Sequence, residues 1–185
     1  MGSLIQTMSG KRTAVFPASF DPVTNGHMDI IRRALALNLF DEIVLGVGVN
    51  PAKRSLFTLE ERVELLKEAV GDWQGQERIR ILAMEGLTAD FARSVEASAI
   101  LRGIRSPLDF EYEAQMYFLN RRLAPEIDTL FLLADPKYAF LSSALVKQVA
   151  QIGGSLDGLA PPQVVQKLRQ RLKENPIHAN AHDAE

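Results

Sequence analysis

Short apolar runs alternate with stretches of helical periodicity along most of the chain. Five apolar runs have the length of strands and predict them at 13–16, 42–49, 78–82, 99–101 and 129–133. Six longer stretches repeat apolar residues at helical spacing and predict helices at 26–37, 59–70, 89–97, 110–123, 143–152 and 162–173. This alternation predicts a parallel sheet, because parallel strands need a crossover connection, which is usually a helix.

Several of the predicted helices begin at residues that favour helix starts. Thr58 followed by Glu61 has the pattern of a capping box, in which each side chain accepts from a backbone N–H at the helix start. Thr88 and Ser142 are N-cap candidates for two later helices. The Pro-Pro pair at 161–162 predicts the start of the last helix, since proline suits the first helical turn.

The alternation predicts one domain over residues 12–174. The chain has 185 residues, enough for one sizeable core, and shows neither an internal repeat nor a second unit. We therefore predict an α/β protein with a single-domain, Rossmann-like parallel sheet and helices on both faces. The polar ends, 1–11 and 175–185, are expected to be flexible.

Composition narrows the class of protein. Apolar residues make up 46% of the chain and charged residues 24%, which is typical of a globular domain. No apolar run approaches the length of a membrane helix, and the N-terminus lacks the pattern of a signal peptide. The absence of cysteine excludes disulfides and thiolate chemistry and suits a cytoplasmic protein. A net charge of −2 argues against general nucleic-acid binding.

Chemically distinctive residues cluster just after the predicted strands. They occupy segments 19–27, 50–54, 86–88, 102–105 and 136–143, whereas the loops at the opposite strand ends look like plain turns. The carboxyl ends of parallel strands share one edge of a sheet, where ligands bind. Loops are polar in general, but this asymmetry favours a binding crevice over chance.

His27 is the first candidate for chemistry. It follows a strand and a loop and lies in the first turn of the predicted helix 26–37, after Gly26, which permits close backbone approach. The positive end of a helix favours a neutral imidazole, whose N–H can donate to a phosphate oxygen. A structural or merely exposed histidine is the alternative.

Cationic and hydroxyl side chains complete the predicted crevice. Arg102 and Arg105 flank a glycine after a buried strand, and guanidinium groups bind phosphate in a bidentate manner. Lys53 follows a strand and a proline. Ser142 and Ser143 precede a helix, where hydroxyls and N–H groups can hold an anion. Solvated surface cations and plain helix capping are the competing interpretations.

The motifs resemble those of a known enzyme family. Ser19-Phe-Asp-Pro followed by Thr24-x-Gly-His27 resembles the signature of the cytidylyltransferase-like nucleotidyltransferases, usually Gly-Thr-Phe-Asp-Pro and His-x-Gly-His. Thr24, in place of the first histidine, is similar to the bacterial phosphopantetheine adenylyltransferases. Later motifs of that family are matched at 50–62, 101–105, 109–113 and 140–143. The resemblance spans about 12–172, and five motifs in order make it specific.

The resemblance implies transfer of the adenylyl group of ATP to 4′-phosphopantetheine, giving dephospho-coenzyme A and pyrophosphate. It implies catalytic roles for His27, Lys53 and Arg102. It implies ATP binding by Ser19, Phe20, His27, Gly103, Ile104, Arg105, Glu113, Tyr138, Ala139, Phe140, Leu141, Ser142, Ser143 and Ala144. It implies phosphopantetheine binding by Ser19, Lys53, Thr88 and Arg102.

The resemblance also implies partners and a cofactor. Mg²⁺ is expected to bind mainly through the ATP phosphates, so we name no metal ligand in the chain. The family forms homohexamers, and we expect the same here. Coenzyme A is a candidate feedback inhibitor, because it shares most of its structure with the product. No nucleic-acid or membrane partner is expected.

The chain departs from the family pattern at a few positions, none of which removes a charged group. Ala18 replaces a glycine, Ser19 a threonine and Ala144 a serine, and Gln148 stands where an acidic residue is common. Ala18 raises the question of whether that position needs a positive φ.

Three alternatives stay open. A related adenylyltransferase could act on nicotinate or nicotinamide mononucleotide, although Thr24 and the 102–113 region count against it. A nucleotide-binding regulator without turnover is a second. A small flavin- or dinucleotide-binding redox protein is a third, although the sequence lacks a G-x-G-x-x-G loop after the first strand.

Overall fold

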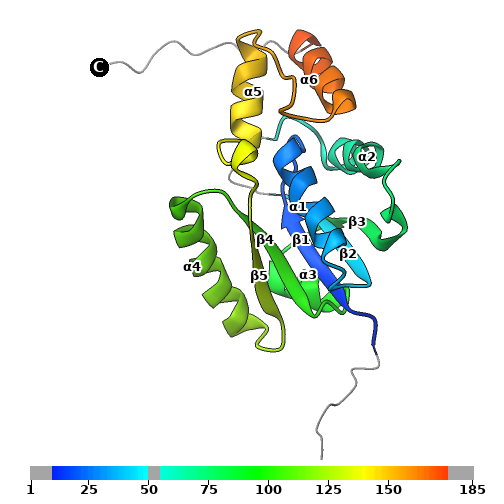
Figure 1. The fold of residues 1–185 in the computed structure, drawn as a ribbon, viewed down its shortest axis with the longest axis vertical. Coiled ribbons are helices and arrows are strands. Elements are labelled where there is room, and N and C mark those ends of the chain that lie inside the picture. Colours follow the sequence, from blue (N-terminus) through cyan, green and yellow to red (C-terminus); the bar gives the residue numbers. More distant parts are fainter. Residues whose placement is uncertain (1–9, 50–54, 175–185) are drawn as a thin grey trace, which may run out of the picture.

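The computed structural model contains one five-stranded sheet, and it describes residues 10–49 and 55–174. All neighbouring strands run parallel, in the order β3-β2-β1-β4-β5. The strands are β1 (Thr13–Ala18), β2 (Glu42–Gly48), β3 (Ile79–Met84), β4 (Ala99–Ile104) and β5 (Asp128–Leu133). The parallel α/β sheet predicted from the alternation is confirmed, with β1 at its centre (Figure 1).

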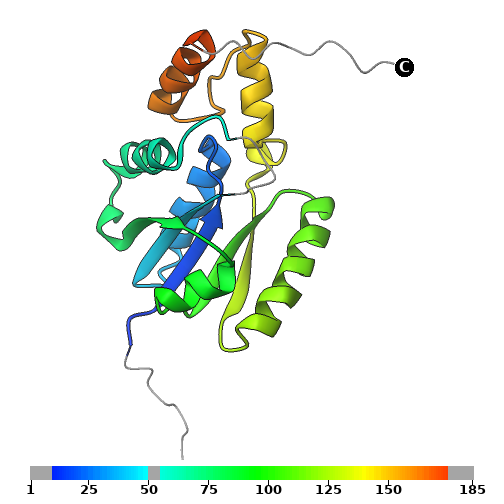
Figure 2. The ribbon, with the colours of Figure 1, turned by 180° about the vertical axis from the view of Figure 1, so that it is seen from behind.

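Six α-helices and two short 3₁₀ turns connect and flank the strands in the part of the chain described. The helices are α1 (Asn25–Ala36), α2 (Leu59–Val70), α3 (Thr88–Ser94), α4 (Pro107–Leu123), α5 (Ser143–Gln151) and α6 (Pro162–Glu174). The 3₁₀ turns are η1 (Gln76–Arg78) and η2 (Pro136–Tyr138). Helix α1 covers one face of the sheet and α3 the opposite face, while α5 and α6 stand beyond the carboxyl ends of the strands (Figures 1 and 2).

Alternate residues of the central strands supply two hydrophobic clusters. Ala14 and Phe16 of β1 belong to the larger cluster, with Ile43 and Leu45 of β2 and residues of α1 and α2. Val15 belongs to the smaller cluster on the α3 side. The period-two alternation of a strand explains this division, and burial on both faces explains why β1 is almost wholly apolar.

Local helix signals were mostly correct. Thr58 and Glu61 form the predicted capping box at α2, and Ser142 caps α5 through a bond from the Leu145 N–H at 3.1 Å. The prediction for Thr88 was wrong: Leu87 is the N-cap of α3 and makes no side-chain bond, so Thr88 is the first helical residue.

Several boundaries also differ from the prediction. Strand β1 extends to Ala18 and β4 to Ile104, so Arg102 lies within a strand and not in the loop after it, as was predicted. Helix α4 begins at Pro107, because Ser106 caps it by accepting from the Asp109 N–H at 3.2 Å. Strand β3 begins one residue late, because η1 includes Arg78. Within residues 10–49 and 55–174, no helix has both the length and the apolar character needed to cross a lipid bilayer.

Candidate active site

Two adjoining cavities open at the carboxyl edge of the sheet. We call the first, of about 320 Å³, the α1-side cavity; its lining includes Thr24, Gly26, His27, Arg105, Ser142 and Ser143. We call the second, of about 570 Å³, the α4-side cavity; its lining includes Met84, Leu87, Thr88, Tyr112, Met116 and Asn120. Both are also lined by Pro17, Ala18, Ser19, Arg102 and Glu113. The end of β1 and Arg102 therefore lie where two ligands could meet.

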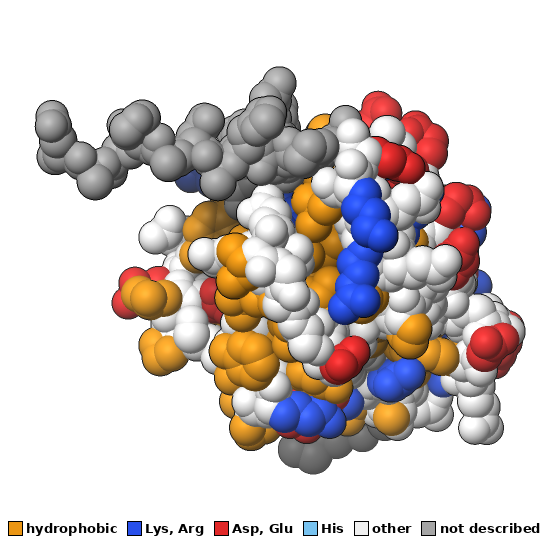
Figure 3. Space-filling view, turned by 90° about the horizontal axis from the view of Figure 1, so that it is seen from above, with side chains coloured by type: hydrophobic (Ala, Val, Ile, Leu, Met, Phe, Trp, Pro, Cys, Tyr) orange, Lys and Arg blue, Asp and Glu red, His pale blue; other side chains and the backbone are white. Residues whose placement is uncertain are grey.

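The surface at this end of the molecule is not uniformly acidic despite the negative net charge. Seen from the side of α5 and α6, Lys and Arg side chains form a short row within a surface that is largely uncharged and apolar (Figure 3). Positive charge at this end suits an anionic ligand.

His27 is held by a capping box that the sequence patterns did not reveal. The Thr24 N–H donates to Nδ1 of His27 at 3.0 Å, and the His27 N–H donates to the Thr24 hydroxyl at 3.4 Å. Because Nδ1 accepts a backbone N–H, the neutral ring carries its proton on Nε2. The ring lines the α1-side cavity, so this tautomer suits donation to a ligand there.

The surroundings of His27 keep its imidazole neutral. Its ring packs beside Phe20, with ring centroids 5.1 Å apart. Burial, and to a smaller extent the positive charges of Arg105 and Arg102, lower the pKa of His27 to about 4. The sequence predicted a neutral ring because His27 lies at the positive end of a helix. The structure also favours a neutral ring, but the main cause is burial.

Arg102 lies on β4 between the two cavities in a fixed orientation. Its Nε and Nη2 donate to the two carboxylate oxygens of Glu113 at 2.6 and 2.5 Å, and Nη1 donates to the Pro17 carbonyl at 2.7 Å. A bidentate pair of this kind sets the plane of the guanidinium. One N–H on each terminal nitrogen has no acceptor within residues 10–49 and 55–174 and is available to a ligand.

Arg105 is likewise paired. Its Nε and Nη2 donate to the Asp109 carboxylate at 2.8 and 3.0 Å, and Nη1 donates to the Leu141 carbonyl at 2.8 Å. Arg102 and Arg105 therefore each have a carboxylate partner, and the net positive field at the crevice is smaller than two free guanidinium groups would give.

The start of α5 brings two predicted serines to the α1-side cavity. Ser142 serves as the N-cap, and the Ser143 hydroxyl donates to the Pro22 carbonyl at 2.7 Å. Both hydroxyls therefore have roles within the fold, while the N-terminus of α5 still faces the cavity. Leu141 just before them is a buried core residue.

The other predicted residues fall into three groups. Those that line a cavity are Ser19, Thr88, Gly103, Glu113 and Ala144. Those outside the lining of both cavities are Phe20, Ile104, Tyr138, Ala139 and Phe140. Lys53 lies outside the residues that the structure describes.

The departure at position 18 needs no unusual backbone. Ala18 is the last residue of β1, and it is not among the described residues with positive φ. The backbone conformation at position 18 is therefore one that alanine adopts without strain, and it does not require the glycine of the family pattern.

The sequence patterns did not single out Asn120 of α4. The residue is 7% exposed and lines the α4-side cavity, yet its side-chain amide makes no hydrogen bond to residues 10–49 or 55–174. No side-chain N or O atom of the described residues is both buried and without a partner, so the amide atoms of Asn120 are open to the cavity, where they can bond to a polar group of a ligand. The available signal was an asparagine inside a helix, where this residue type is disfavoured.

Asp21 belongs to the Ser19-Phe-Asp-Pro motif, and the sequence predicted no role for it. In the structure its side chain connects three segments of the site. Its buried carboxylate accepts from the Leu56 and Phe57 N–H groups at 2.9 and 3.0 Å and from Lys147 Nζ of α5 at 3.0 Å. The loop after β1, the segment before α2 and helix α5 are thereby held together.

Comparison with known proteins gives a consistent result. Residues 15–149 match the family model described as Cytidylyltransferase-like. A phosphopantetheine adenylyltransferase of Caldanaerobacter subterraneus subsp. tengcongensis is 47% identical over 164 residues, covering 89% of this chain and 99% of the relative. That of Moorella thermoacetica is 47% identical over 160 residues, covering 86% and 97% of the two chains. That of Frankia casuarinae is 48% identical over 164 residues, covering 88% and 99%.

Solved structures share the fold at much lower identity. A putative nicotinate-nucleotide adenylyltransferase from Vibrio parahaemolyticus has a TM-score of 0.65 at 17% identity, covering 89% of this chain and 93% of that one. Plasmodium falciparum nicotinic acid mononucleotide adenylyltransferase, complexed with NaAD, has a TM-score of 0.67 at 13% identity, covering 91% and 97%.

Proposed function

Because the chain belongs to the cytidylyltransferase-like family, and within it to the phosphopantetheine adenylyltransferases, we propose that it transfers the adenylyl group of ATP to 4′-phosphopantetheine. The products are dephospho-coenzyme A and pyrophosphate. The observation that carries the proposal is the pair of cavities that share Ser19 and Arg102, since a transfer enzyme must bring two substrates together at one point.

The chemistry needs no covalent intermediate on the protein. A phosphate oxygen of phosphopantetheine attacks the α-phosphorus of ATP, a new P–O bond forms, and the bond to the bridging oxygen of pyrophosphate breaks. The nucleophile is already an anion, so catalysis rests on alignment and on stabilising charge on the phosphoryl oxygens. The neutral His27, with its proton on Nε2, supplies such a hydrogen-bond donor without prior deprotonation.

We assign ATP to the α1-side cavity. It contains His27 and the N-terminus of α5 with Ser142 and Ser143, a favourable place for the β- and γ-phosphates. Gly26 and Gly103 also line it. A Cβ at Gly103 would lie only 3.3 Å from Ile30 of α1, so this glycine allows α1 to pack closely on β4.

We assign phosphopantetheine to the α4-side cavity. Its walls include apolar side chains from three segments, Met84, Leu87 and Met116, which suit the methylene and dimethyl groups of the arm. Asn120 offers one acceptor and two donors to the amide groups of the arm. Lys53, assigned from the family motif, and the free N–H groups of Arg102 would contact its phosphate.

We propose that Mg²⁺ enters with ATP and neutralises phosphate charge during transfer. Within residues 10–49 and 55–174, no three His, Asp or Glu side chains gather into a metal site. Glu113, which lines both cavities, is already paired with Arg102, and Asp21 in the loop after β1 is paired with Lys147. This favours coordination mainly by phosphate oxygens and water.

We further propose a homohexamer in the cytoplasm, where both charged substrates would be available. Helix α4 supports association, because Leu108, Phe110, Phe118 and Leu119 are exposed on it, and large exposed apolar patches mark interfaces. Light scattering should give six times the mass of one chain. Coenzyme A, which contains the pantetheine arm, should compete with phosphopantetheine if it is a feedback inhibitor.

A substrate panel tests the reaction directly. We expect pyrophosphate release from ATP with 4′-phosphopantetheine and little with nicotinate or nicotinamide mononucleotide. If the protein prefers a mononucleotide, it is a nicotinate or nicotinamide mononucleotide adenylyltransferase and the proposed function is wrong. Tight ATP binding with no product from any acceptor would favour a nucleotide-binding regulator.

A further inference from the structure

Within the described residues, the buried guanidinium of Arg62 is bonded to backbone carbonyls and to no side chain. Arg62 lies on α2 and is 2% exposed. Its Nη1 donates to the carbonyls of Ser19 and Gly48 at 2.7 and 2.8 Å, and its Nε donates to the Thr58 carbonyl at 3.3 Å. No carboxylate of residues 10–49 or 55–174 forms an ion pair with it.

This arrangement is costly for a purely structural contact. A buried charge is destabilising unless it is paired or fully hydrogen-bonded, and arginines inside proteins usually have a carboxylate partner. The other two arginines of the crevice, Arg102 and Arg105, have one. Arg62 instead joins the carboxyl ends of β1 and β2, and one of its acceptors is Ser19, a residue that lines both cavities.

The bond to Ser19 sets the orientation of the next peptide group. The Ser19–Phe20 peptide is trans, since the described cis bond is Asp21–Pro22, so its N–H points away from the carbonyl that Arg62 holds. The Phe20 N–H makes no hydrogen bond to residues 10–49 or 55–174. Phe20 also adopts a φ of 47°, a left-handed conformation that is uncommon outside glycine.

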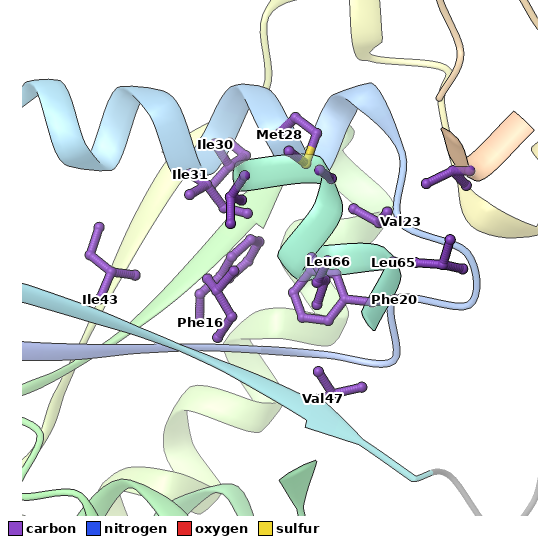
Figure 4. Packing of buried hydrophobic residues seen from close by; sticks show 14 of the residues in the cluster. Phe16, Phe20, Val23, Met28, Ile30, Ile31, Ile43, Val47, Leu65 and Leu66 are labelled. Carbon is purple, nitrogen blue, oxygen red and sulfur yellow. The ribbon is translucent and has the colours of Figure 1, made fainter. Parts of the chain in front are cut away.

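The Phe20 side chain holds the same peptide from the other end. Its ring is 1% exposed and lies in the hydrophobic cluster near Phe16 and Leu66 (Figure 4). The peptide is thus fixed between the buried ring and the guanidinium. Ser19 of this peptide lines both cavities, although Phe20 itself is in the lining of neither. A backbone donor that is orientated in advance beside the cavities, and has no acceptor among the described residues, suits an anionic oxygen.

We propose that Arg62 is a positioning residue: it holds the Ser19–Phe20 peptide so that the Phe20 N–H donates to a phosphate oxygen of the nucleotide. The inference rests on the proposed function for the identity of the nucleotide, but it acts on ATP binding and can be measured without turnover.

The experiment compares ATP binding by calorimetry in the full-length wild type, Arg62→Met and Arg62→Lys, together with the Phe20 amide signal in ¹⁵N NMR spectra. Loss of one charge-assisted hydrogen bond should raise the dissociation constant for ATP about tenfold in Arg62→Met. Lysine keeps the charge but cannot span both carbonyls, so Arg62→Lys should fold and bind ATP about threefold to tenfold more weakly. The shift of the Phe20 amide on adding ATP should shrink in both.

Arg78→Met is the matched control, because Arg78 donates to the Phe40 carbonyl at the opposite edge of the sheet. It should lower the melting temperature and leave the affinity for ATP unchanged. If Arg62→Met does not fold, Arg62→Lys decides. Wild-type ATP affinity in a folded Arg62 variant, or a Phe20 amide that ATP does not shift in the wild type, overturns the inference. Failure of the proposed function is a separate result, namely a wild type that binds ATP and forms no dephospho-coenzyme A.

Discussion

The backbone N–H of Thr24 donates to Nδ1 of His27 over 3.0 Å, so the residue that starts α1 also sets the tautomer of its imidazole. The same pair returns a second bond, from the His27 N–H to the Thr24 hydroxyl at 3.4 Å. One capping box therefore orientates the helix and the donor together, leaving Nε2–H for a ligand in the α1-side cavity.

Replacing His27 by alanine should chiefly affect turnover. We expect kcat to fall by about 10²–10³, the usual range for deletion of a donor that acts in the transition state, with a modest loss of ATP affinity. Steady-state kinetics and ATP calorimetry on the folded variant measure the two effects. If binding and turnover fall equally, His27 positions the substrate instead.

The titration of His27 gives a second prediction. The folded pKa is about 4, below the usual value of 6.5, so His27 stays neutral at physiological pH. NMR of the ring protons, assigned by comparison with His27→Asn, should show a midpoint near 4. A midpoint near 6.5 would contradict the buried environment found here.

The same shift predicts how stability depends on pH. Between pH 6.5 and about 4 the unfolded chain binds a proton at His27 that the folded chain does not, so unfolding becomes easier as pH falls. Stability from this group is fully present above pH 6.5 and is lost progressively toward pH 4, with a slope of up to about 1.4 kcal/mol per pH unit. His27→Asn should lack that slope in denaturant titrations at pH 7, 6 and 5.

Arg102→Ala should raise the KM for phosphopantetheine more than the KM for ATP. The substitution removes the N–H groups that face the shared wall of the two cavities and leaves Glu113 as an unpaired carboxylate. Glu113→Gln is the control, because it keeps the shape of the pair but weakens its hold on the guanidinium. An effect confined to ATP would exchange the two ligand assignments.

Asn120→Ala should raise the KM for phosphopantetheine about tenfold, the cost of one or two hydrogen bonds to the arm, while kcat and the KM for ATP stay near wild type. The expectation follows from its unpartnered amide in the α4-side cavity. Gln170→Ala, on an exposed part of α6, is the matched amide control. Unchanged KM for phosphopantetheine in Asn120→Ala would remove this residue from the binding site.

Features that depend on neighbours in sequence could be predicted. The Thr58–Glu61 box and the Ser142 cap join residues three apart, so the pattern contains both partners. The Thr24–His27 box is equally local, but histidine at the third helical position does not match the usual Glu or Gln pattern. Thr88 shows the limit of such signals, because a good capping residue was placed one position inside the helix.

By itself, the sequence determined the order of strands and helices, the edge at which the site lies and the family to which the chain belongs. The tertiary structure decided how these cations are paired: Arg102 with Glu113 and Arg105 with Asp109, whereas the Arg62 partners within residues 10–49 and 55–174 are uncharged carbonyls. It also placed the amide of Asn120 in a cavity, with no hydrogen-bond partner among the same residues. Side-chain partners from different elements depend on how a helix is rotated against the sheet, and the burial of each group depends on the whole packing. Neither quantity is encoded in a short stretch of residues.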